Sequence, residues 1–369
     1  MDTFAFIIHP IDPKRDVSRK FPFLGRVLSE RQIDFFSTFF PPVFISEIEG
    51  ITSQATGKEI KGWFVASPYT PRRMMELAEH TVYGKIIQTG RLAEKLGAQI
   101  LGLGAFTSVV GDAGVTIAKA LDIPVTTGDS YTVTVAVEAL QEAARAMNIP
   151  LRGATVAVVG ATGAIGQVCA ELLSEDVERL YLIGRRREAL EALRDRLAPR
   201  AKAGLIVSTT MDVLSDAQLI LTVTSAIHAI IRPEHLQPGS VVCDVARPRD
   251  VSAMVAAARD DILVIDGGMV DVPGPVDFHF NFGFPPGKAY ACMAETIALA
   301  LEGRFEDYTL GKHLTRERVE EISAMAKKHG FRLSGFRSFE REVTQQHIDT
   351  VRRNARRAWK ARNLYAARA

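Results

Sequence analysis

Cysteine and long apolar runs are both scarce in this chain of 369 residues. The three cysteines, Cys169, Cys243 and Cys292, are too few and too widely spaced for a disulfide framework or a zinc site. No apolar run approaches the roughly 18 residues that a transmembrane helix requires. The first residues carry an acid where a signal peptide carries basic charge, and their apolar run ends at Pro10. The sequence therefore predicts a cytoplasmic protein without a metal site.

An excess of charge of one sign is also absent. The chain has 45 basic and 43 acidic residues, so its net charge of +2 does not predict a nucleic-acid partner. Residues 336–369 depart from this balance, because they hold nine basic and three acidic side chains. They have the pattern of a terminal helix. That helix is either simply solvated or a cationic docking surface for an acidic carrier protein or an anionic membrane.

Residues 155–187 have the pattern of a dinucleotide-binding unit. A short β-branched run at 155–159 precedes a glycine-rich turn, a helical segment and a second strand. The first glycine permits a tight turn, the second lets the backbone approach a pyrophosphate, and the third lets the helix pack on the strand. The helix start would bind the phosphates. The predicted phosphate-binding residues are Gly160, Ala161, Thr162, Gly163, Ala164, Ile165 and Gly166.

The end of the second strand indicates which nicotinamide cofactor binds. An NAD site usually has an acid there for the ribose hydroxyls, whereas this chain has Arg185, Arg186 and Arg187 and no acid before Glu188. Guanidinium groups suit the 2′-phosphate of NADPH, because they form paired, charge-assisted hydrogen bonds. We therefore expect NADPH, with Arg185 and Arg186 as ligands. The alternative is a solvated basic turn.

Further alternation indicates an α/β protein with a Rossmann-type doubly wound parallel sheet. Strand patterns alternate with helical segments, at 205–210, 217–226, 240–246 and 261–268. Ligands of such sheets bind at the carboxyl ends of the strands. We therefore expect Thr224 and Ser225, and also 266–268, near the nicotinamide, although ordinary turn formation explains these residues equally well.

The sequence suggests four consecutive segments. They are a separate N-terminal α/β substrate domain at 1–128, an NADP-binding Rossmann domain at 129–285 with a leading helix at 131–148, C-terminal helices at 286–335, and a basic helical tail at 336–369.

The three cysteines differ in their surroundings. Cys169 and Cys243 lie within apolar patterns and are expected to be buried packing residues. Cys292 follows the breaker-rich loop 283–287 and Lys288, in the first turn of an expected helix that begins near Lys288. A helix N-terminus and a nearby cation both lower the pKa of a thiol, which favours a nucleophilic role. The alternative is a small core residue in an alanine-rich helix.

Two other features are candidates for substrate contact. Five phenylalanines crowd ten positions, and they form either a core or interdomain patch, or a wall for a long acyl chain or a lipid-facing surface; they are Phe35, Phe36, Phe39, Phe40 and Phe44. Two small, hydroxyl-rich loops, at 104–108 and 126–132, provide the candidate substrate-binding residues, although turn formation alone also explains them. Those residues are Phe106, Thr107, Ser108, Thr127 and Gly128.

Taken together, the motifs resemble the long-chain fatty acyl-[acyl-carrier-protein] reductase family of cyanobacteria. The resemblance runs from about Asp16 to Phe331, through segments in the family's order: DVSRK (16–20), TSQATGK (52–58), GAFTS (104–108), TTGDSYT (126–132), GATGAIG (160–166), CMAETIALALEG (292–303) and KHGF (328–331). The chain departs from the family pattern in an extra residue within 52–58, in Asp129 where asparagine is expected, and in its last 34 residues.

The resemblance implies reduction of a fatty acyl thioester to a fatty aldehyde with NADPH. It also implies that Cys292 becomes acylated and that acyl-carrier protein or acyl-CoA is the donor. The residues do not identify the general acid; His228 and His279 are candidates. Two alternatives remain: a shikimate-dehydrogenase-like oxidoreductase that acts directly on a small ketone or alcohol, and a non-catalytic NADPH-sensing protein.

Overall fold

The structure is a computed structural model that describes the backbone of residues 1–366 and the side chains of residues 1–361. Its residues form two compact units, one of 1–132 with 270–334 and the other of 133–269 with 335–369. This grouping differs from the four consecutive segments expected from the sequence. The C-terminal helices join the N-terminal segment because they pack on its sheet, and the basic tail joins the Rossmann segment.

The first unit is built on a five-stranded sheet. Its strand order is β2-β3-β1-β4-β5, with β2 antiparallel to β3 and the other neighbours parallel. The central strand β1 contributes the fully buried Phe4, Ala5 and Ile7 to the core. The strands are β1 (Asp2–Ile8), β2 (Val43–Thr52), β3 (Glu59–Ala66), β4 (Leu101–Leu103) and β5 (Val125–Thr126).

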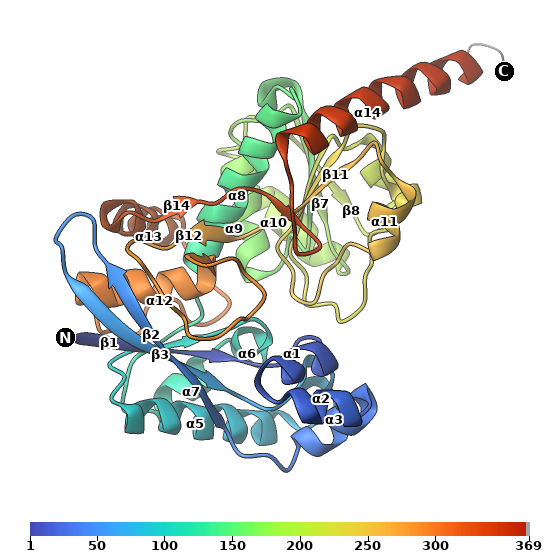
Figure 1. Ribbon diagram of the computed structural model, residues 1–369. Coiled ribbons are helices and arrows are strands. Elements are labelled where there is room, and N and C mark those ends of the chain that lie inside the picture. The colour runs from blue at the N-terminus through green and yellow to red at the C-terminus, as the bar shows by residue number, and fades with distance from the viewer. Residues whose placement is uncertain (367–369) are drawn as a thin grey trace. The chain divides into compact units, whose positions relative to one another are not determined.

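Helices cover both faces of this sheet. Figure 1 shows α5 (Glu79–Leu96) on one side and α12 (Ala291–Glu302) on the other. Ten of the twelve residues of α12 are buried, as expected for a helix enclosed by its own unit. The remaining helices of this unit are α1 (Pro13–Lys20), α2 (Pro22–Val27), α3 (Glu30–Ser37), α4 (Pro71–Glu76), α6 (Phe106–Val109), α7 (Val115–Ala120) and α13 (Arg316–His329). A small sheet of β13 (Lys288–Tyr290), β12 (Met269–Asp271) and β14 (Arg332–Leu333) completes it.

The second unit confirms the predicted doubly wound parallel sheet. Its strand order is β11-β10-β9-β6-β7-β8, and every pair of neighbouring strands in it is parallel. The order reverses between β6 and β9, which is where Rossmann-type sheets bind dinucleotides. The strands are β6 (Thr155–Val159), β7 (Arg179–Ile183), β8 (Gly204–Ser208), β9 (Leu219–Thr222), β10 (Val241–Asp244) and β11 (Leu263–Asp266).

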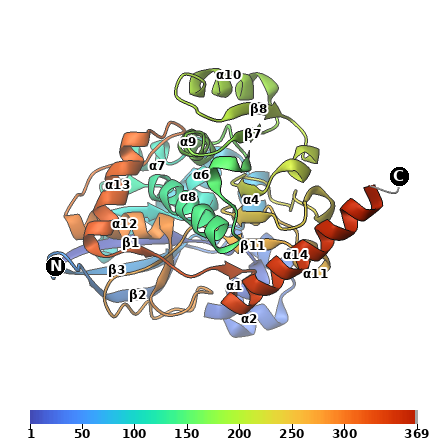
Figure 2. The same cartoon turned by 90° about the horizontal axis from the view of Figure 1, so that it is seen from above.

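Four helices accompany this sheet: α8 (Asp129–Ala146), α9 (Ala164–Leu173), α10 (Arg187–Leu197) and α11 (Ala253–Ala258). Figure 2 shows α10 beside the edge strand β8. No helix in the described part of the chain combines the length and the apolar character of a membrane span.

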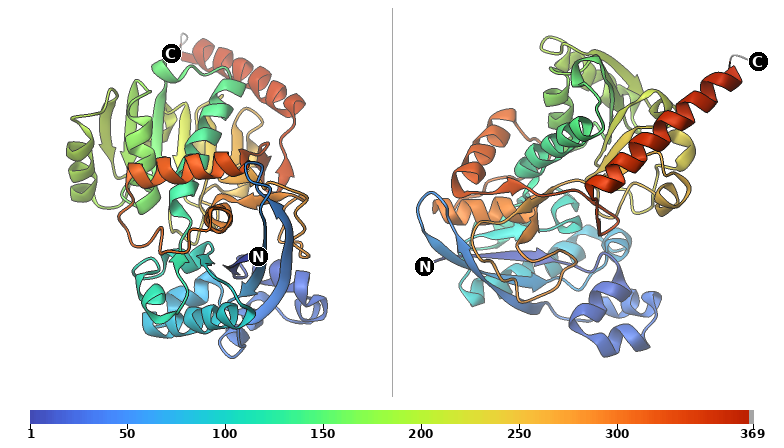
Figure 3. Two further views of the ribbon diagram at one scale, coloured as in Figure 1. Left: turned by 90° about the vertical axis from the view of Figure 1, so that its left-hand side faces the viewer. Right: turned by 45° about the horizontal axis from the view of Figure 1, so that its top comes forward.

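The expected basic tail is partly a hairpin and partly a helix. Strands β15 (Arg337–Ser338) and β16 (Arg341–Glu342) pair first, and α14 (Gln345–Ala366) follows. Ile348 and Val351 on α14 are buried, and the Trp359 indole N–H donates to the Pro238 carbonyl at 2.8 Å. The helix is therefore seated on its unit through one face, and its last turns extend outward (Figure 3).

Candidate functional site

Cys292 lies in the first turn of α12, as the sequence predicts. The helix begins three residues later than expected, because Lys288–Tyr290 forms β13 and Tyr290 is the N-cap. The backbones of Ala105 and Met293 hydrogen-bond to the thiol and lower its pKa. Ala105 has a φ of 47°, a conformation that is costly for a residue with a Cβ. The loop before α6 is thus held in a strained shape beside Cys292.

The expected low pKa of the Cys292 thiol is wrong. Burial and the nearby Asp129 carboxyl raise it to about 12, which outweighs the two backbone groups. Lys288 does not supply the expected free cation, because its ammonium is 2.6 Å from Asp271 Oδ1 and donates to Ser334 at 2.5 Å. The resting thiol is therefore protonated at neutral pH, so its use as a nucleophile requires a base.

The loop before α8 lies directly against Cys292. Gly128 has a φ of 79°, and a Cβ built on it would lie 2.3 Å from Cys292 Cα. Only glycine fits this position, since both the conformation and the contact exclude a side chain. The next residue, Asp129, begins α8 and is buried; burial and the charge of Glu295 raise the pKa of its carboxyl to about 7. A group that titrates near neutrality therefore lies beside the thiol.

Glu295 holds the two helix starts together. Its carboxylate accepts hydrogen bonds from the Thr126 hydroxyl at 2.5 Å, the Thr309 hydroxyl at 2.7 Å and the Tyr131 backbone N–H at 2.8 Å. The side chain is fully buried, and burial raises its pKa. A buried carboxyl with this many donors is a structural anchor, and it fixes α12, and hence Cys292, against the first turn of α8.

The predicted substrate loop at 104–108 is buried, and its hydroxyls bond to their own turn. Thr107 donates to the Gly104 carbonyl and Ser108 donates to the Ala105 carbonyl. The Phe106 backbone N–H donates to His9 Nε2 at 3.0 Å. Burial lowers the pKa of His9 to about 4, so its imidazole is uncharged at neutral pH. These contacts support the loop and use the hydroxyl protons of Thr107 and Ser108, so each hydroxyl could meet a substrate only as an acceptor.

Four buried side-chain atoms in this unit have no hydrogen-bond partner among the described residues: Thr127 Oγ1, His9 Nδ1, Ser67 Oγ and Arg318 Nη1. Buried polar atoms are nearly always bonded, so each is available to a ligand or to water. Thr127 is one of the predicted substrate-binding residues. His9 is not, because its role depends on a contact with a loop almost a hundred residues away.

Asp129 and Glu295 also belong to this site, although no local pattern in the sequence predicts them as members. The two histidines predicted as candidate general acids lie on the surface. His228 is exposed in a loop, and exposed His279 is 3.4 Å from Glu49 and 3.3 Å from Asp277. Cys169 and Cys243 are buried, as predicted, and burial raises the pKa of each thiol.

In the second unit, the glycine-rich turn has the geometry of a phosphate site. Gly160 has a φ of 85°, and a Cβ on Gly166 would lie 2.2 Å from the Gly160 carbonyl oxygen. Gly163 is the N-cap of α9 and has no side-chain cap, so the first N–H groups of that helix remain available. Ala161, Thr162, Ala164 and Ile165 complete the turn.

The end of β7 presents unpaired guanidinium groups. Arg185 and Arg186 are exposed and form no ion pair within the described residues, whereas Arg187 pairs with Glu191 at 2.9 Å. The two unpaired side chains fit a 2′-phosphate.

Thr224 and Ser225, which are predicted to lie near the nicotinamide, follow the end of β9 and differ in their surroundings. The Thr224 hydroxyl donates to Asp250 at 2.5 Å, and Ser225 is exposed. Thr224 is thus held by its own unit, while the Ser225 side chain remains accessible.

Comparisons with known proteins place the chain among its relatives. The Shikimate / quinate 5-dehydrogenase family matches residues 141–266. The chain is 34% identical over 311 residues to "Aminotransferase PigE" from Serratia sp.; this covers 82% of the chain, which spans about 36% of that relative's length. It is 30% identical over 345 residues to the long-chain acyl-[acyl-carrier-protein] reductase of Synechococcus elongatus, covering 89% of this chain and 98% of that protein.

Solved structures are more distant. L-tryptophan dehydrogenase from Nostoc punctiforme is 12% identical with a TM-score of 0.41, covering 96% of this chain and 88% of its own. A shikimate dehydrogenase in complex with NADP+ is 14% identical with a TM-score of 0.39, covering 89% of this chain and 96% of its own.

The match over 89% of this chain and 98% of the Synechococcus protein shows the family. The cofactor is NADPH, and the chain is an NAD(P)-dependent oxidoreductase. It belongs, as a divergent relative, to the long-chain acyl-[acyl-carrier-protein] reductase family.

Proposed function

We propose that this chain reduces a long-chain fatty acyl thioester to the fatty aldehyde through an acyl thioester on Cys292. The observation that carries the proposal is the setting of that thiol at the start of α12, where two backbone groups bond to it and Asp129 lies beside it. Backbone N–H groups at a helix start are suited to a developing oxyanion. The acyl donor is acyl-carrier protein or acyl-CoA.

In the acylation step, Sγ of Cys292 attacks the carbonyl carbon of the donor. The thiol proton passes to Asp129, whose raised pKa matches a base that works near neutrality. The bond between the carbonyl carbon and the donor sulfur then breaks, and the departing thiolate takes a proton. Acyl-cysteine and the free donor thiol are the products.

In the reduction step, NADPH supplies a hydride to the carbonyl carbon when it is bound. The glycine turn and the side chains of Arg185 and Arg186 would hold its phosphates, and Ser225 would be the accessible group at the nicotinamide end. The oxyanion collapses, the bond from carbon to Cys292 Sγ breaks, and the thiolate takes a proton. One thioester, one NADPH and one proton thus yield an aldehyde, a thiol and NADP+.

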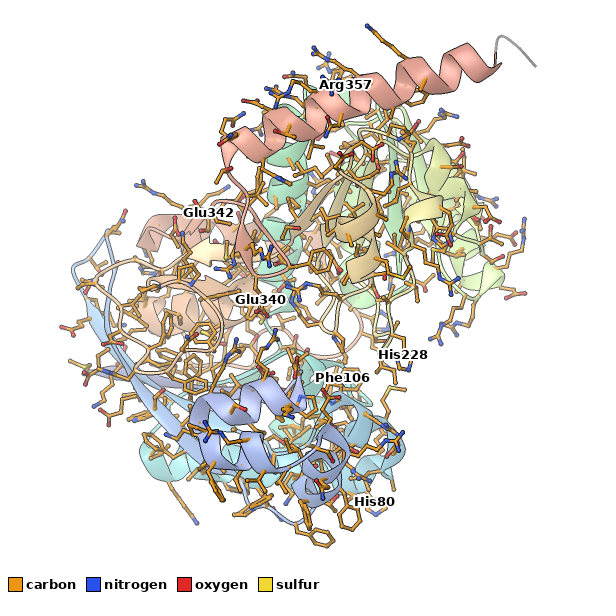
Figure 4. All side chains as sticks on the ribbon, turned by 45° about the vertical axis from the view of Figure 1, so that its right-hand side comes forward. His80, Phe106, His228, Glu340, Glu342 and Arg357 are labelled. Atoms are coloured by element: carbon orange, nitrogen blue, oxygen red, sulfur yellow. The ribbon has the colours of Figure 1, made fainter. Side chains whose placement is uncertain are left out.

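The basic face of α14 is our proposed docking surface for an acidic carrier protein. Arg356, Arg357 and Lys360 are exposed and form no ion pair with any described residue. Arg357 is labelled on α14 in Figure 4. The opposite face is held by the buried Ile348 and Val351, so the cations stand on a fixed helix.

The proposed reaction is tested by product identification. The protein is incubated with NADPH and a long-chain acyl-carrier protein or acyl-CoA, and the organic extract is analysed for fatty aldehyde by mass spectrometry. We expect aldehyde in proportion to NADPH consumed. NADPH oxidation without aldehyde, or aldehyde formation undiminished in Cys292→Ala, would contradict the proposal.

The match to the Shikimate / quinate 5-dehydrogenase family favours one alternative, direct hydride exchange with a small ketone or alcohol. That reaction has no covalent step, so Cys292→Ala would retain activity. Turnover of a small alcohol with NADP+, together with no reaction of acyl thioesters, would establish it.

A further inference from the structure

Helix α3 buries one charged and one small polar side chain and exposes aromatic ones. Its buried residues are Ile33, Asp34 and Ser37, which are 6%, 9% and 3% exposed, whereas Phe35 and Phe36 of the same helix are exposed. A surface helix ordinarily directs its apolar stripe inward and its charged side chains to water. This arrangement excludes the interpretation of the phenylalanine run as a core patch.

Polar contacts hold α3 in this orientation. The helix begins with a capping box between Ser29 and Gln32. Asp34 accepts a hydrogen bond from the Thr70 hydroxyl and pairs with Arg73 at 3.2 Å. Because these contacts anchor the helix, the outward phenylalanines are not required to attach it to the unit.

We call the outward residues the aromatic surface, defined as Phe35, Phe36, Phe39, Phe40 and Phe44. The rings of Phe35 and Phe36 are 5.4 Å apart, and those of Phe35 and Phe39 are 5.7 Å apart. All five are exposed, Phe39 by 71%. Contiguous exposed apolar side chains of this kind mark an interaction site.

The charges near the aromatic surface are mainly basic. Residues 13–40 contain six basic and three acidic side chains. Two of the acids are neutralised, since Asp34 is buried against Arg73 and Asp16 pairs with Arg19 at 2.9 Å. The exposed Arg31 lies one helical turn before Phe35, and exposed Arg26 lies in the last turn of α2.

We propose that the aromatic surface and its flanking arginines bind the surface of an anionic lipid bilayer. The phenyl rings would enter the boundary between headgroups and acyl chains, and Arg26 and Arg31 would meet the lipid phosphates. The surface combines exposed phenyl rings with exposed cationic side chains at its flank. This combination of an apolar face and basic charge is the one that an anionic bilayer attracts, through buried apolar area and through its lipid phosphates.

The test is cosedimentation of the full chain with vesicles. Phosphatidylcholine vesicles are compared with vesicles that also contain phosphatidylglycerol, and no acyl thioester or NADPH is present, so the result is independent of the proposed reaction. We expect binding to the anionic vesicles only, reduced on the order of tenfold in Phe35→Ser/Phe39→Ser. Arg26→Glu/Arg31→Glu should also weaken it. Met254→Ser, which changes an exposed apolar side chain of the other unit, should not.

A second readout is a single tryptophan at the surface. When anionic vesicles are added, the tryptophan fluorescence of Phe39→Trp should shift to shorter wavelength by more than that of wild type. Unchanged thermal unfolding of the variants checks that the fold is retained. The proposal is overturned if wild type does not bind anionic vesicles, or if Phe35→Ser/Phe39→Ser binds them as well as wild type does. It is also overturned if that variant instead converts a dimer to a monomer in analytical ultracentrifugation.

Discussion

Gly128 and Cys292 are in backbone contact, so closely that a Cβ on Gly128 would lie 2.3 Å from Cys292 Cα. This contact sets the nucleophile against the first turn of α8. Gly128→Ala therefore combines a left-handed φ, which alone costs about 1–2 kcal/mol for a residue with a Cβ, with a clash against backbone that has to move.

We expect Gly128→Ala to lower both the melting temperature and the rate of aldehyde formation, the latter by more than about tenfold, since a cost above about 1.4 kcal/mol corresponds to that factor. Gly84→Ala is the matched control. Gly84 lies within α5, and a Cβ there meets nothing within 4 Å, so the change should leave activity intact. Equal activity of the two variants would show that the contact does not position Cys292.

Asp129 should give acylation a pH dependence. With a pKa raised to about 7, its carboxyl becomes an available base as pH rises through neutrality. Asp129→Asn removes that base, and we expect the acylation rate at pH 8 to fall by about a hundredfold, at the low end for general base catalysis. Single-turnover rates across pH provide the measurement; an unaltered profile in Asp129→Asn would exclude the role.

The same carboxyl should lower stability at alkaline pH. Its folded pKa is raised above the ordinary aspartate value of 3.8, so the folded chain binds the proton more tightly than the unfolded chain. Stability from this group is complete below about pH 4 and declines as pH rises through about 7. Urea titrations should therefore show Asp129→Asn gaining stability over wild type at pH 8 but not at pH 4. A gain of equal size at both would refute the linkage.

The guanidinium pair at the end of β7 should select NADPH. Removing charge-assisted bonds to the 2′-phosphate with Arg185→Ala/Arg186→Ala should weaken NADPH binding about tenfold to a hundredfold and NADH binding little. Arg187→Ala is the control, because Arg187 already pairs with Glu191. Fluorescence titrations with NADPH and with NADH measure the effect. An equal loss of affinity for NADH would show that the two arginines do not bind the 2′-phosphate.

The basic face of α14 should affect the kinetics only when the acyl group is delivered by acyl-carrier protein. Arg356→Glu/Arg357→Glu/Lys360→Glu should raise KM for acyl-carrier protein, weaken its salt dependence and leave acyl-CoA kinetics unchanged. Charge reversal is preferable to deletion of 336–369, which would also remove the buried Ile348 and Val351. If the charge reversal does not change KM for acyl-carrier protein, the helix has no docking role.

The sequence predicts the parts of the fold and of the site that are formed by neighbouring residues. The Rossmann strands, the glycine turn and the placement of Cys292 in a first helical turn follow from residues that are adjacent in sequence. The thiol pKa does not, since it depends on burial and on the charge of Asp129 from another element. Likewise, His9 supports a loop about a hundred positions away.

The orientation of the phenylalanine run is a second feature that the sequence alone does not determine. Five phenylalanines in ten positions are compatible with a core patch or with an exposed surface. The exposure of all five, together with the contacts of Asp34 with Thr70 and Arg73, shows which face of α3 is turned to solvent. Composition gives the number of apolar side chains, whereas tertiary contacts determine which face they occupy.

The central claim, covalent acylation of Cys292, is tested most directly by intact mass spectrometry after incubation with a long-chain acyl donor in the absence of NADPH. We predict one added acyl group in wild type and in Cys243→Ala, none in Cys292→Ala, and loss of the adduct with release of aldehyde when NADPH is added. A wild-type chain that forms aldehyde with no adduct, or an adduct that persists in Cys292→Ala, would contradict the account.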